Sequence, residues 1–99
     1  MNILVVDDDR DITNLIGKYL TVEGYDVSVA YDGEKGLEIF NDKRFDLVIL
    51  DIMMSPINGF EFLQKIRKMN KEVIVFFLTA KDAEIDRVYG FRLGADDYI

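Results

Sequence analysis

Short apolar runs rich in β-branched residues alternate along this chain with longer segments in which apolar residues recur every three or four positions. A short continuous apolar run is typical of a buried strand, and recurrence every three or four positions is typical of an amphipathic helix. The runs predict strands at residues 3–6, 27–30, 47–50, 73–78 and 98–99.

Four helices are predicted between these strands. The first ends at Gly24, which supplies a stop signal. The second is expected at about residues 33–40, where Gly36 lowers helix propensity, and the others at about residues 59–69 and 83–93. The apolar stripes consist of Ile12, Leu15, Ile16, Tyr19 and Leu20, then Leu37 and Phe40, then Phe62, Leu63, Ile66 and Met69, and last Ile85, Val88, Tyr89 and Arg92.

Strands that alternate with helices form βαβ units with right-handed crossovers, so the pattern predicts an α/β fold with a doubly wound parallel sheet. The runs at residues 3–6, 47–50 and 73–78 are apolar almost throughout, which indicates burial on both faces and a central place in the sheet. The run at residues 27–30 is expected at an edge.

The composition limits the class of protein. The chain has 99 residues, the length of one domain, and its 49% hydrophobic content and single proline indicate an ordered globule. No apolar run approaches the roughly 18 residues of a membrane span, and no secretory leader is apparent, so a cytoplasmic location is expected. The absence of cysteine and histidine excludes disulfides, thiolate and imidazole ligands and Ser-His catalysis. The net charge of -7 argues against nucleic-acid binding by this segment.

Two of the central apolar runs end in aspartate, the first in Asp7, Asp8 and Asp9 and the other in Asp51. Because the carboxyl ends of parallel strands meet at one edge, these carboxylates are expected to lie close together. Crowded, desolvated anions need a positive partner, and Mg2+ bound by oxygen ligands is the simplest one. Asp8 and Asp51 can each give one oxygen to the ion, with Asp7 held through water.

With such an ion bound, the Asp51 carboxylate is suited to attack phosphorus and form an acyl phosphate. Thr79, at the end of the fourth strand, can donate its hydroxyl to a phosphoryl oxygen. The alternative is that these residues only form turns and cap helices, since an aspartate after a strand is commonly an N-cap. Asp9 or Asp11 is expected to cap the first helix in this way.

Over its whole length the chain resembles the receiver domain of a two-component response regulator. The resemblance lies in Ile3-Leu4-Val5-Val6-Asp7-Asp8-Asp9, Asp46-Leu47-Val48-Ile49-Leu50-Asp51, Asn58-Gly59-Phe60, Leu78-Thr79-Ala80 and Gly94-Ala95-Asp96-Asp97-Tyr98-Ile99. It implies one receiver domain over residues 1–99, with a flavodoxin-like sheet of strand order 2-1-3-4-5. The segment from Asp86-Arg87-Val88 onward is similar to the subfamily whose effector is a winged-helix DNA-binding domain.

The resemblance implies that Asp51 is the phosphoacceptor and that a sensor histidine kinase is the donor. Asp7 and Asp8 would form the acidic pair that holds Mg2+ together with Asp51 and the backbone carbonyl of Met53. Such a chain is a signalling domain rather than an enzyme, limited to Mg2+-dependent self-phosphorylation and slow autodephosphorylation. The full protein would control a DNA-binding transcriptional output.

Two features differ from the family pattern. Proline stands at Pro56, one position later than usual, and Ser55 takes its place, so the loop over the metal site is expected to follow a different path. The chain ends at Ile99, before the place of the family's phosphate-binding lysine and fifth helix. Coupling of the phosphate to Thr79, the switch hydroxyl, and Tyr98, the switch aromatic, is therefore expected to be impaired. The apolar surface and sheet edge left bare are expected to favour a homodimer or an exchanged dimer.

Two other functions stay open. A docking or dimerisation module that works without phosphorylation fits the missing lysine but leaves the acidic residues unexplained. An Mg2+-dependent aspartyl phosphohydrolase needs a second acid near its nucleophile, whereas Met53 stands two residues after Asp51.

Overall fold

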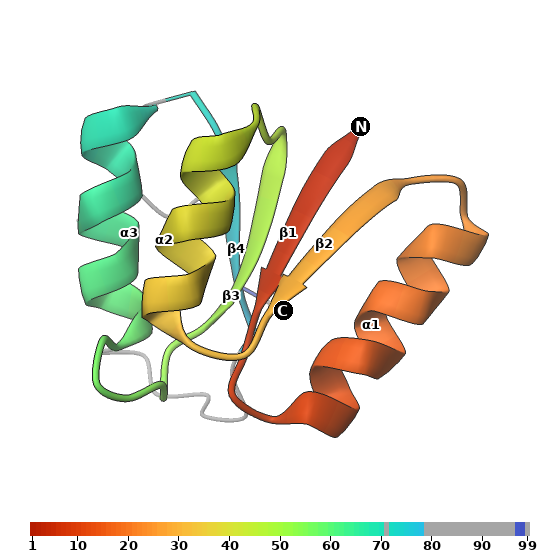
Figure 1. The fold of residues 1–99 in the computed structure, drawn as a ribbon, viewed down its shortest axis with the longest axis horizontal. Helices are drawn as coiled ribbons and strands as arrows, with labels where there is room; N and C mark the ends of the chain where they lie inside the picture. The colour runs from red at the N-terminus through yellow and green to blue at the C-terminus, as the bar shows by residue number, and fades with distance from the viewer. Residues whose placement is uncertain (71, 79–96, 99) are drawn as a thin grey trace.

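A parallel sheet with the strand order β2-β1-β3-β4-β5 forms the centre of the molecule (Figure 1). The structure is a computed structural model that describes residues 1–70, 72–78 and 97–98. The strands are β1 (Asn2–Val6), β2 (Asp26–Ala30), β3 (Leu47–Asp51), β4 (Ile74–Leu78) and β5 (Asp97–Tyr98). The predicted strand order is confirmed, with β2 at one edge and β1, β3 and β4 inside the sheet.

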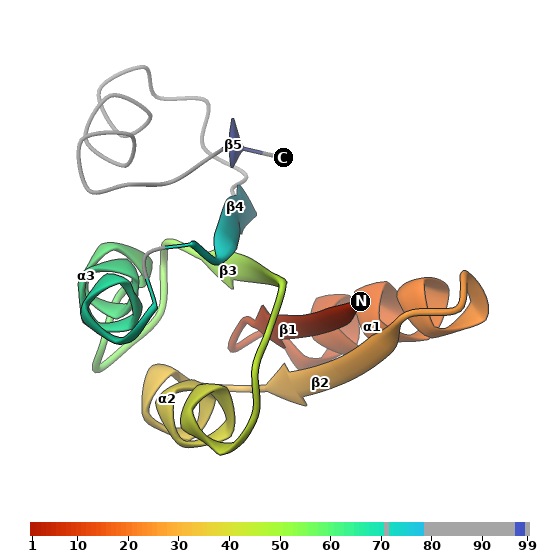
Figure 2. The ribbon, with the colours of Figure 1, turned by 90° about the horizontal axis from the view of Figure 1, so that it is seen from above.

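Helices cover both faces of this sheet. The helices of the described residues are α1 (Arg10–Val22), α2 (Gly33–Asp42) and α3 (Gly59–Met69). Seen from above, α1 lies on one face, whereas α2 and α3 lie side by side on the other (Figure 2). The doubly wound arrangement is therefore confirmed. The helix expected at residues 83–93 lies outside the described residues.

Polar residues begin each helix by accepting hydrogen bonds from backbone amides that the helix itself leaves unpaired. Asp9 accepts from the amides of Asp11 and Ile12, which confirms Asp9 as the cap of α1. Asn58 and Glu61 form a reciprocal capping box at the start of α3. These caps define where α3 begins, directly after the loop that follows Asp51.

The core has two parts because alternate side chains of each central strand point to opposite faces. Leu4 and Val6 of β1 belong to the cluster under α2 and α3, whereas Ile3 and Val5 belong to the cluster under α1. All four side chains are at most 1% exposed. Burial on both faces explains why this strand is apolar without alternation.

The apolar stripe of α1 is only partly buried. Ile16 and Leu20 pack against the sheet, whereas Leu15 and Tyr19 remain 69% and 65% exposed. The helix rests on the sheet along one side of its stripe, so the other side faces away from the described residues. Met69, expected on the stripe of α3, is the last residue of that helix and is also exposed.

Gly36, expected only to weaken α2, has a packing role. A Cβ atom there would lie 2.9 Å from the ring of Phe62 in α3 and 3.1 Å from Val6 in β1. Glycine therefore lets α2 approach both elements closely, and this packing outweighs its poor helix propensity.

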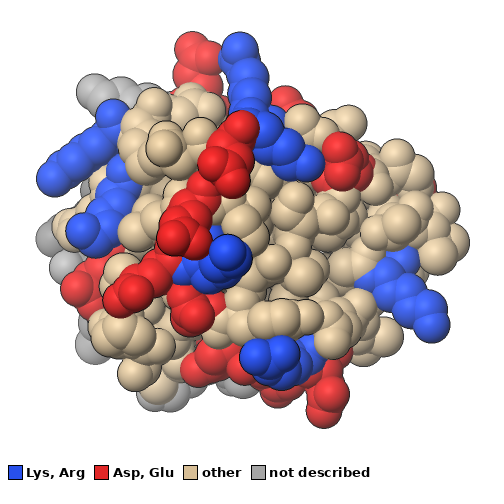
Figure 3. Space-filling view, in the orientation of Figure 1, with Lys and Arg blue, Asp and Glu red and all other residues tan. Residues whose placement is uncertain are grey.

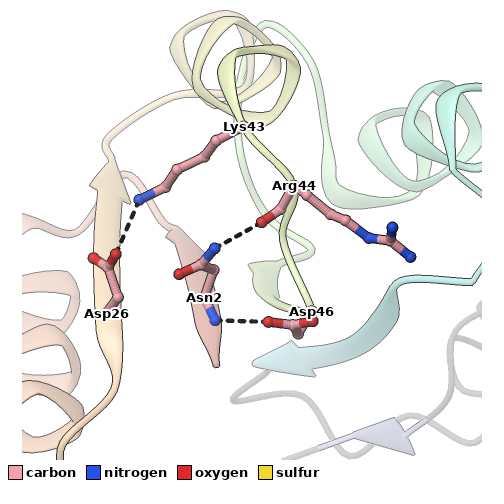
Figure 4. Close-up of polar contacts among 5 residues, drawn as sticks. All are labelled: Asn2, Asp26, Lys43, Arg44 and Asp46. Atoms are coloured by element: carbon pink, nitrogen blue, oxygen red, sulfur yellow. Dashed lines mark hydrogen bonds and ion pairs between the residues drawn. The ribbon is translucent and has the colours of Figure 1, made fainter.

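The edge where the strands begin is held by polar contacts from the loop between α2 and β3 (Figure 4). The Asn2 amide donates to the Asp46 carboxylate at 2.8 Å, and the Asn2 side chain donates to the Arg44 carbonyl at 2.9 Å. Lys43 forms an ion pair with Asp26 of β2 at 3.5 Å. These contacts join β1, β2 and β3 at the edge opposite to the predicted acidic site.

Candidate metal and phosphoryl site

The predicted acidic residues meet at the edge where β1 and β3 end. Val6 of β1 is paired with Leu50 of β3, so Asp7 and Asp51 follow directly on neighbouring strands. Asp7, Asp8 and Asp51 each place a carboxylate oxygen within 4.8 Å of the others. Parallel register thus brings together residues 44 positions apart in the sequence.

Backbone amides orient two of these carboxylates. The Asp9 amide donates to Oδ1 of Asp7 at 2.9 Å, and the Met53 amide donates to Oδ1 of Asp51 at 3.1 Å. Asp7 is 4% exposed, Asp51 is half-buried and Asp8 is exposed. The group therefore includes a desolvated carboxylate and two that solvent or a ligand can reach.

Burial raises the pKa of Asp7 from 3.8 to about 6. The hydrogen bond from the Asp9 amide opposes this rise, whereas the charges of Asp51 and Asp8 and a hydrogen bond with Asp51 add to it. The site therefore concentrates negative charge, and no lysine or arginine of the described residues forms an ion pair with these three carboxylates.

Asp7→Asn is expected to stabilise the chain at neutral pH without divalent cations. Since the raised pKa makes the folded state bind more protons than the unfolded state, the free energy of unfolding of the unmodified chain falls as the pH rises from about 4 to about 6. One pKa unit corresponds to about 1.4 kcal/mol, so a rise from 3.8 to about 6 implies a gain from asparagine of up to about 3 kcal/mol at neutral pH. Urea denaturation across this pH range measures the difference in unfolding free energy between Asp7→Asn and the unmodified chain.

The control for this experiment is Asp8→Asn, which removes an exposed carboxylate from the same group. It should shift the unfolding free energy much less, because a solvated charge costs little. If the free energy of unfolding changed with pH in the same way for the unmodified chain and Asp7→Asn, the expected free-energy cost of ionising Asp7 in the folded state would be contradicted.

The donor set fits a hard divalent cation. Three carboxylates converge, and oxygen ligands are those that Mg2+ prefers. A cation among them would also offset the charges of Asp51 and Asp8, which add to the rise that burial causes in the pKa of Asp7. Binding of the cation by the Met53 carbonyl stays a prediction. The Met53 side chain is exposed, and the Met53 amide donates to the Asp51 carboxylate.

The start of α3 lies directly against the loop that follows Asp51. The Gly59 amide donates to the Ile52 carbonyl at 2.9 Å. A Cβ atom on Gly59 would stand 2.4 Å from the Asp51 carbonyl oxygen and 2.7 Å from the Ile52 Cα. Between these residues the Ser55–Pro56 peptide bond is cis. The motif containing Gly59 was visible in the sequence, but its contact with Asp51 was not.

Two predicted site residues lie wholly or partly outside the described residues. Thr79 lies outside the described residues; the residue before it, Leu78, is paired with Asp51 of β3. The backbone of Tyr98 belongs to β5 and is paired with Phe77 of β4, but its side chain lies outside what the structure describes. The switch roles of Thr79 and Tyr98 stay predictions.

Charge is unevenly distributed over the surface. In the view of Figure 3, acidic side chains run over α2 and gather along the lower rim, the edge where the strands end, while the right half over β2 and α1 is largely uncharged. The acidic carboxylates of the site belong to this edge.

Comparison with known proteins agrees with this arrangement. The family model for the response regulator receiver domain matches residues 3–99. The chain belongs to this family. It is therefore the receiver domain of a two-component response regulator, a signalling domain, and the expected resemblance is confirmed.

The receiver domain has relatives among transcriptional regulators. It is 45% identical over 97 residues to the transcriptional regulatory protein CpxR of Escherichia coli, covering 98% of this chain and 41% of that protein. It is 42% identical over 96 residues to the uncharacterized transcriptional regulatory protein YcbL of Bacillus subtilis, covering 97% and 42%. The chain thus spans about two fifths of the length of these relatives. Both relatives are named as transcriptional regulatory proteins.

Solved receiver structures share the fold. The chemotaxis protein CheY4 of Vibrio cholerae superposes with a TM-score of 0.96 at 30% identity, over 99% of this chain and 83% of that one. The receiver domain of the Francisella response regulator 1452 gives 0.91 at 34% identity, over 99% and 81%. Within the described residues, no helix combines the length and apolar character needed to cross a membrane.

Proposed function

We propose that this receiver domain accepts a phosphoryl group on Asp51 from a phosphohistidine of a sensor histidine kinase. The observation that carries the proposal is the meeting of Asp7, Asp8 and Asp51, with carboxylate oxygens within 4.8 Å, at one sheet edge in a chain of this family. Because these 99 residues contain no histidine, the phosphohistidine of the donor lies outside this segment.

The Asp51 carboxylate acts as the nucleophile. One of its oxygens attacks the phosphorus, the phosphorus–nitrogen bond to the donor imidazole breaks, and the imidazole leaves with its electron pair and is protonated. The hydrogen bond from the Met53 amide to Oδ1 holds the carboxylate in one orientation. Its half-buried position leaves it within reach of a donor.

Asp7, Asp8, Asp51 and the Met53 carbonyl are the groups we propose to hold Mg2+. When bound, the ion neutralises charge on the phosphoryl oxygens. The residues themselves provide the anionic pocket, and Asp7 is kept in place by the Asp9 amide.

Thr79, Tyr98 and another part of the full protein would turn phosphorylation of Asp51 into an output. Thr79 would bind a phosphoryl oxygen through its hydroxyl, and Tyr98 would report the change to a partner surface. The relatives are named as transcriptional regulatory proteins, which supports a DNA-binding output carried by another part of the full protein. This segment itself has a net charge of -7 and is not proposed to contact nucleic acid.

Two alternatives are less well supported. A phosphohydrolase of this kind would need a second acid two residues after Asp51, where the exposed apolar residue Met53 stands instead. A docking or dimerisation module gains some support from Leu15, Tyr19 and Val22, which expose apolar surface on α1. The homodimer or exchanged dimer expected from the sequence stays a prediction, as does the cytoplasmic location.

Incubation with acetyl phosphate tests the proposal. We expect a phosphoryl adduct by intact mass when Mg2+ is present and none when the cation is chelated, since the acidic pocket repels an anionic donor unless a cation offsets it. Borohydride reduces an aspartyl phosphate to homoserine, so peptide sequencing should find homoserine at position 51. An adduct at another residue, or no adduct with Mg2+ present, would refute the proposal.

A further inference from the structure

One buried hydroxyl contacts the backbone of the acidic turn. Among the described residues, the polar side chains classed as buried are those of Asp7 and Thr13, and Thr13 is fully buried. Oγ1 of Thr13 lies 3.0 Å from the carbonyl oxygen of Asp7 and 2.8 Å from that of Asp9. The first carbonyl precedes Asp8 and the second follows Asp9, so the two lie at the ends of the Asp8-Asp9 pair.

The two contacts differ in origin. A threonine within a helix commonly donates to the carbonyl four residues earlier, and the contact with Asp9 is of this kind. The carbonyl of Asp7 lies six residues before Thr13 and outside the helix, so helical geometry alone does not bring it within reach. Thr21, near the end of α1, makes only the ordinary contact, donating to Gly17 at 2.7 Å.

The contact with Asp7 constrains the turn that presents the acids. The Thr13 hydroxyl lies within hydrogen-bond distance of the carbonyls of Asp7 and Asp9, so it restrains the peptide plane that leads into Asp8 and the plane that leads out of Asp9. The Asp7 amide donates to the Ala30 carbonyl of β2 at 3.1 Å. Thr13 therefore ties the turn to α1, while Ala30 ties it to the sheet.

We propose that Thr13 is a positioning residue for the divalent cation: its hydroxyl holds the Asp7–Asp9 turn so that the carboxylates of Asp7 and Asp8 converge with that of Asp51. This inference rests on the proposed function of the acidic site. It assigns Thr13 no contact with the ion or the phosphoryl group. Groups that orient metal ligands in this way affect metal affinity even though they do not bind the metal.

Binding of Mn2+, a paramagnetic probe for an oxygen-ligand site, tests the inference by titration followed with electron paramagnetic resonance. Thr13→Val, which keeps the shape and removes the hydroxyl, should weaken Mn2+ binding by about ten-fold or more. Thr13→Ser restores the hydroxyl and should bind within about two-fold of the unmodified chain. Thr21→Val removes the ordinary helical contact from the same helix and should leave the affinity unchanged.

Circular dichroism confirms that each variant is folded, and Thr13→Ala replaces Thr13→Val if the latter does not fold. The inference is overturned if the folded variant without the hydroxyl binds Mn2+ as tightly as the unmodified chain. It is also overturned if Thr13→Ser binds as weakly as Thr13→Val, or if the unmodified chain binds no Mn2+.

The two proposals fail separately. A chain that binds Mn2+ but is not labelled by acetyl phosphate would refute phosphorylation and leave the Thr13 comparison intact. A chain labelled on Asp51 whose Mn2+ affinity ignores the Thr13 hydroxyl would refute only the positioning role.

Discussion

Replacing Asp51 with asparagine is expected to abolish phosphoryl labelling by acetyl phosphate in the presence of Mg2+. An amide oxygen lacks the negative charge that makes the carboxylate a nucleophile, and no acyl phosphate can form on it. The adduct seen by intact mass in the unmodified chain should fall to the background of the assay.

Loss of labelling in Asp51→Asn should not result from unfolding. The charge of Asp51 is one cause of the raised pKa of Asp7, so its removal relieves repulsion in the folded state. We therefore expect Asp51→Asn to be at least as stable as the unmodified chain at neutral pH without divalent cations, as urea denaturation can show.

Asp46→Asn is the matched control for Asp51→Asn. Asp46 directly precedes β3, whereas Asp51 is the last residue of β3. The Asp46 carboxylate accepts a hydrogen bond from the Asn2 amide, at the edge of the sheet opposite to the acidic site. An asparagine side chain can still accept there, so labelling of Asp46→Asn should equal that of the unmodified chain. Equal labelling of Asp51→Asn would contradict the assignment of the phosphoacceptor.

Gly59→Ala is expected to destabilise the chain and to impair the site. The added Cβ would meet the Asp51 carbonyl oxygen at 2.4 Å and the Ile52 Cα at 2.7 Å, and backbone atoms cannot move aside as a flexible side chain can. Overpacking of this kind costs about 1–3 kcal/mol, and the upper end is expected here. Since the loop after Asp51 must shift, the rate of labelling should fall as well.

Gly24→Ala separates this steric effect from a general effect of losing glycine. Gly24 has a φ of 96° and no atom within 4 Å of a Cβ, so alanine there meets backbone strain but no neighbour. It should cost about 1 kcal/mol and leave labelling unchanged. Labelling by folded Gly59→Ala at the unmodified rate would contradict a role for this contact in positioning the site.

Local patterns predicted the elements of this fold well. The third helix was expected at residues 59–69, where α3 lies, and each of the first four strands was placed within one residue of its observed ends. The second helix extends two residues further than expected, to Asp42. Cap residues and buried apolar runs act over a few positions, so a single sequence displays them directly.

Residues in tertiary contact were harder to foresee. Gly36 was expected to weaken α2, yet it is where that helix packs against Phe62 and Val6. Three of the five residues in the apolar stripe of α1, Ile12, Leu15 and Tyr19, are exposed, because the spacing of apolar residues defines a face without saying how much of it is covered.

The sequence by itself determined the order of strands and helices along the chain, the place of Asp7 directly after β1 and of Asp51 at the end of β3, and hence that acids share one edge. Only the tertiary structure decided that Asp7 is buried beside Asp51, that Gly59 abuts the Asp51 backbone and that the Thr13 hydroxyl reaches the Asp7 carbonyl. The physical reason is that these effects come from residues far apart in the sequence. Burial by such residues raises the pKa of Asp7, and the close approach of the Asp51 backbone makes glycine necessary at position 59. Such contacts exist only once the chain has packed.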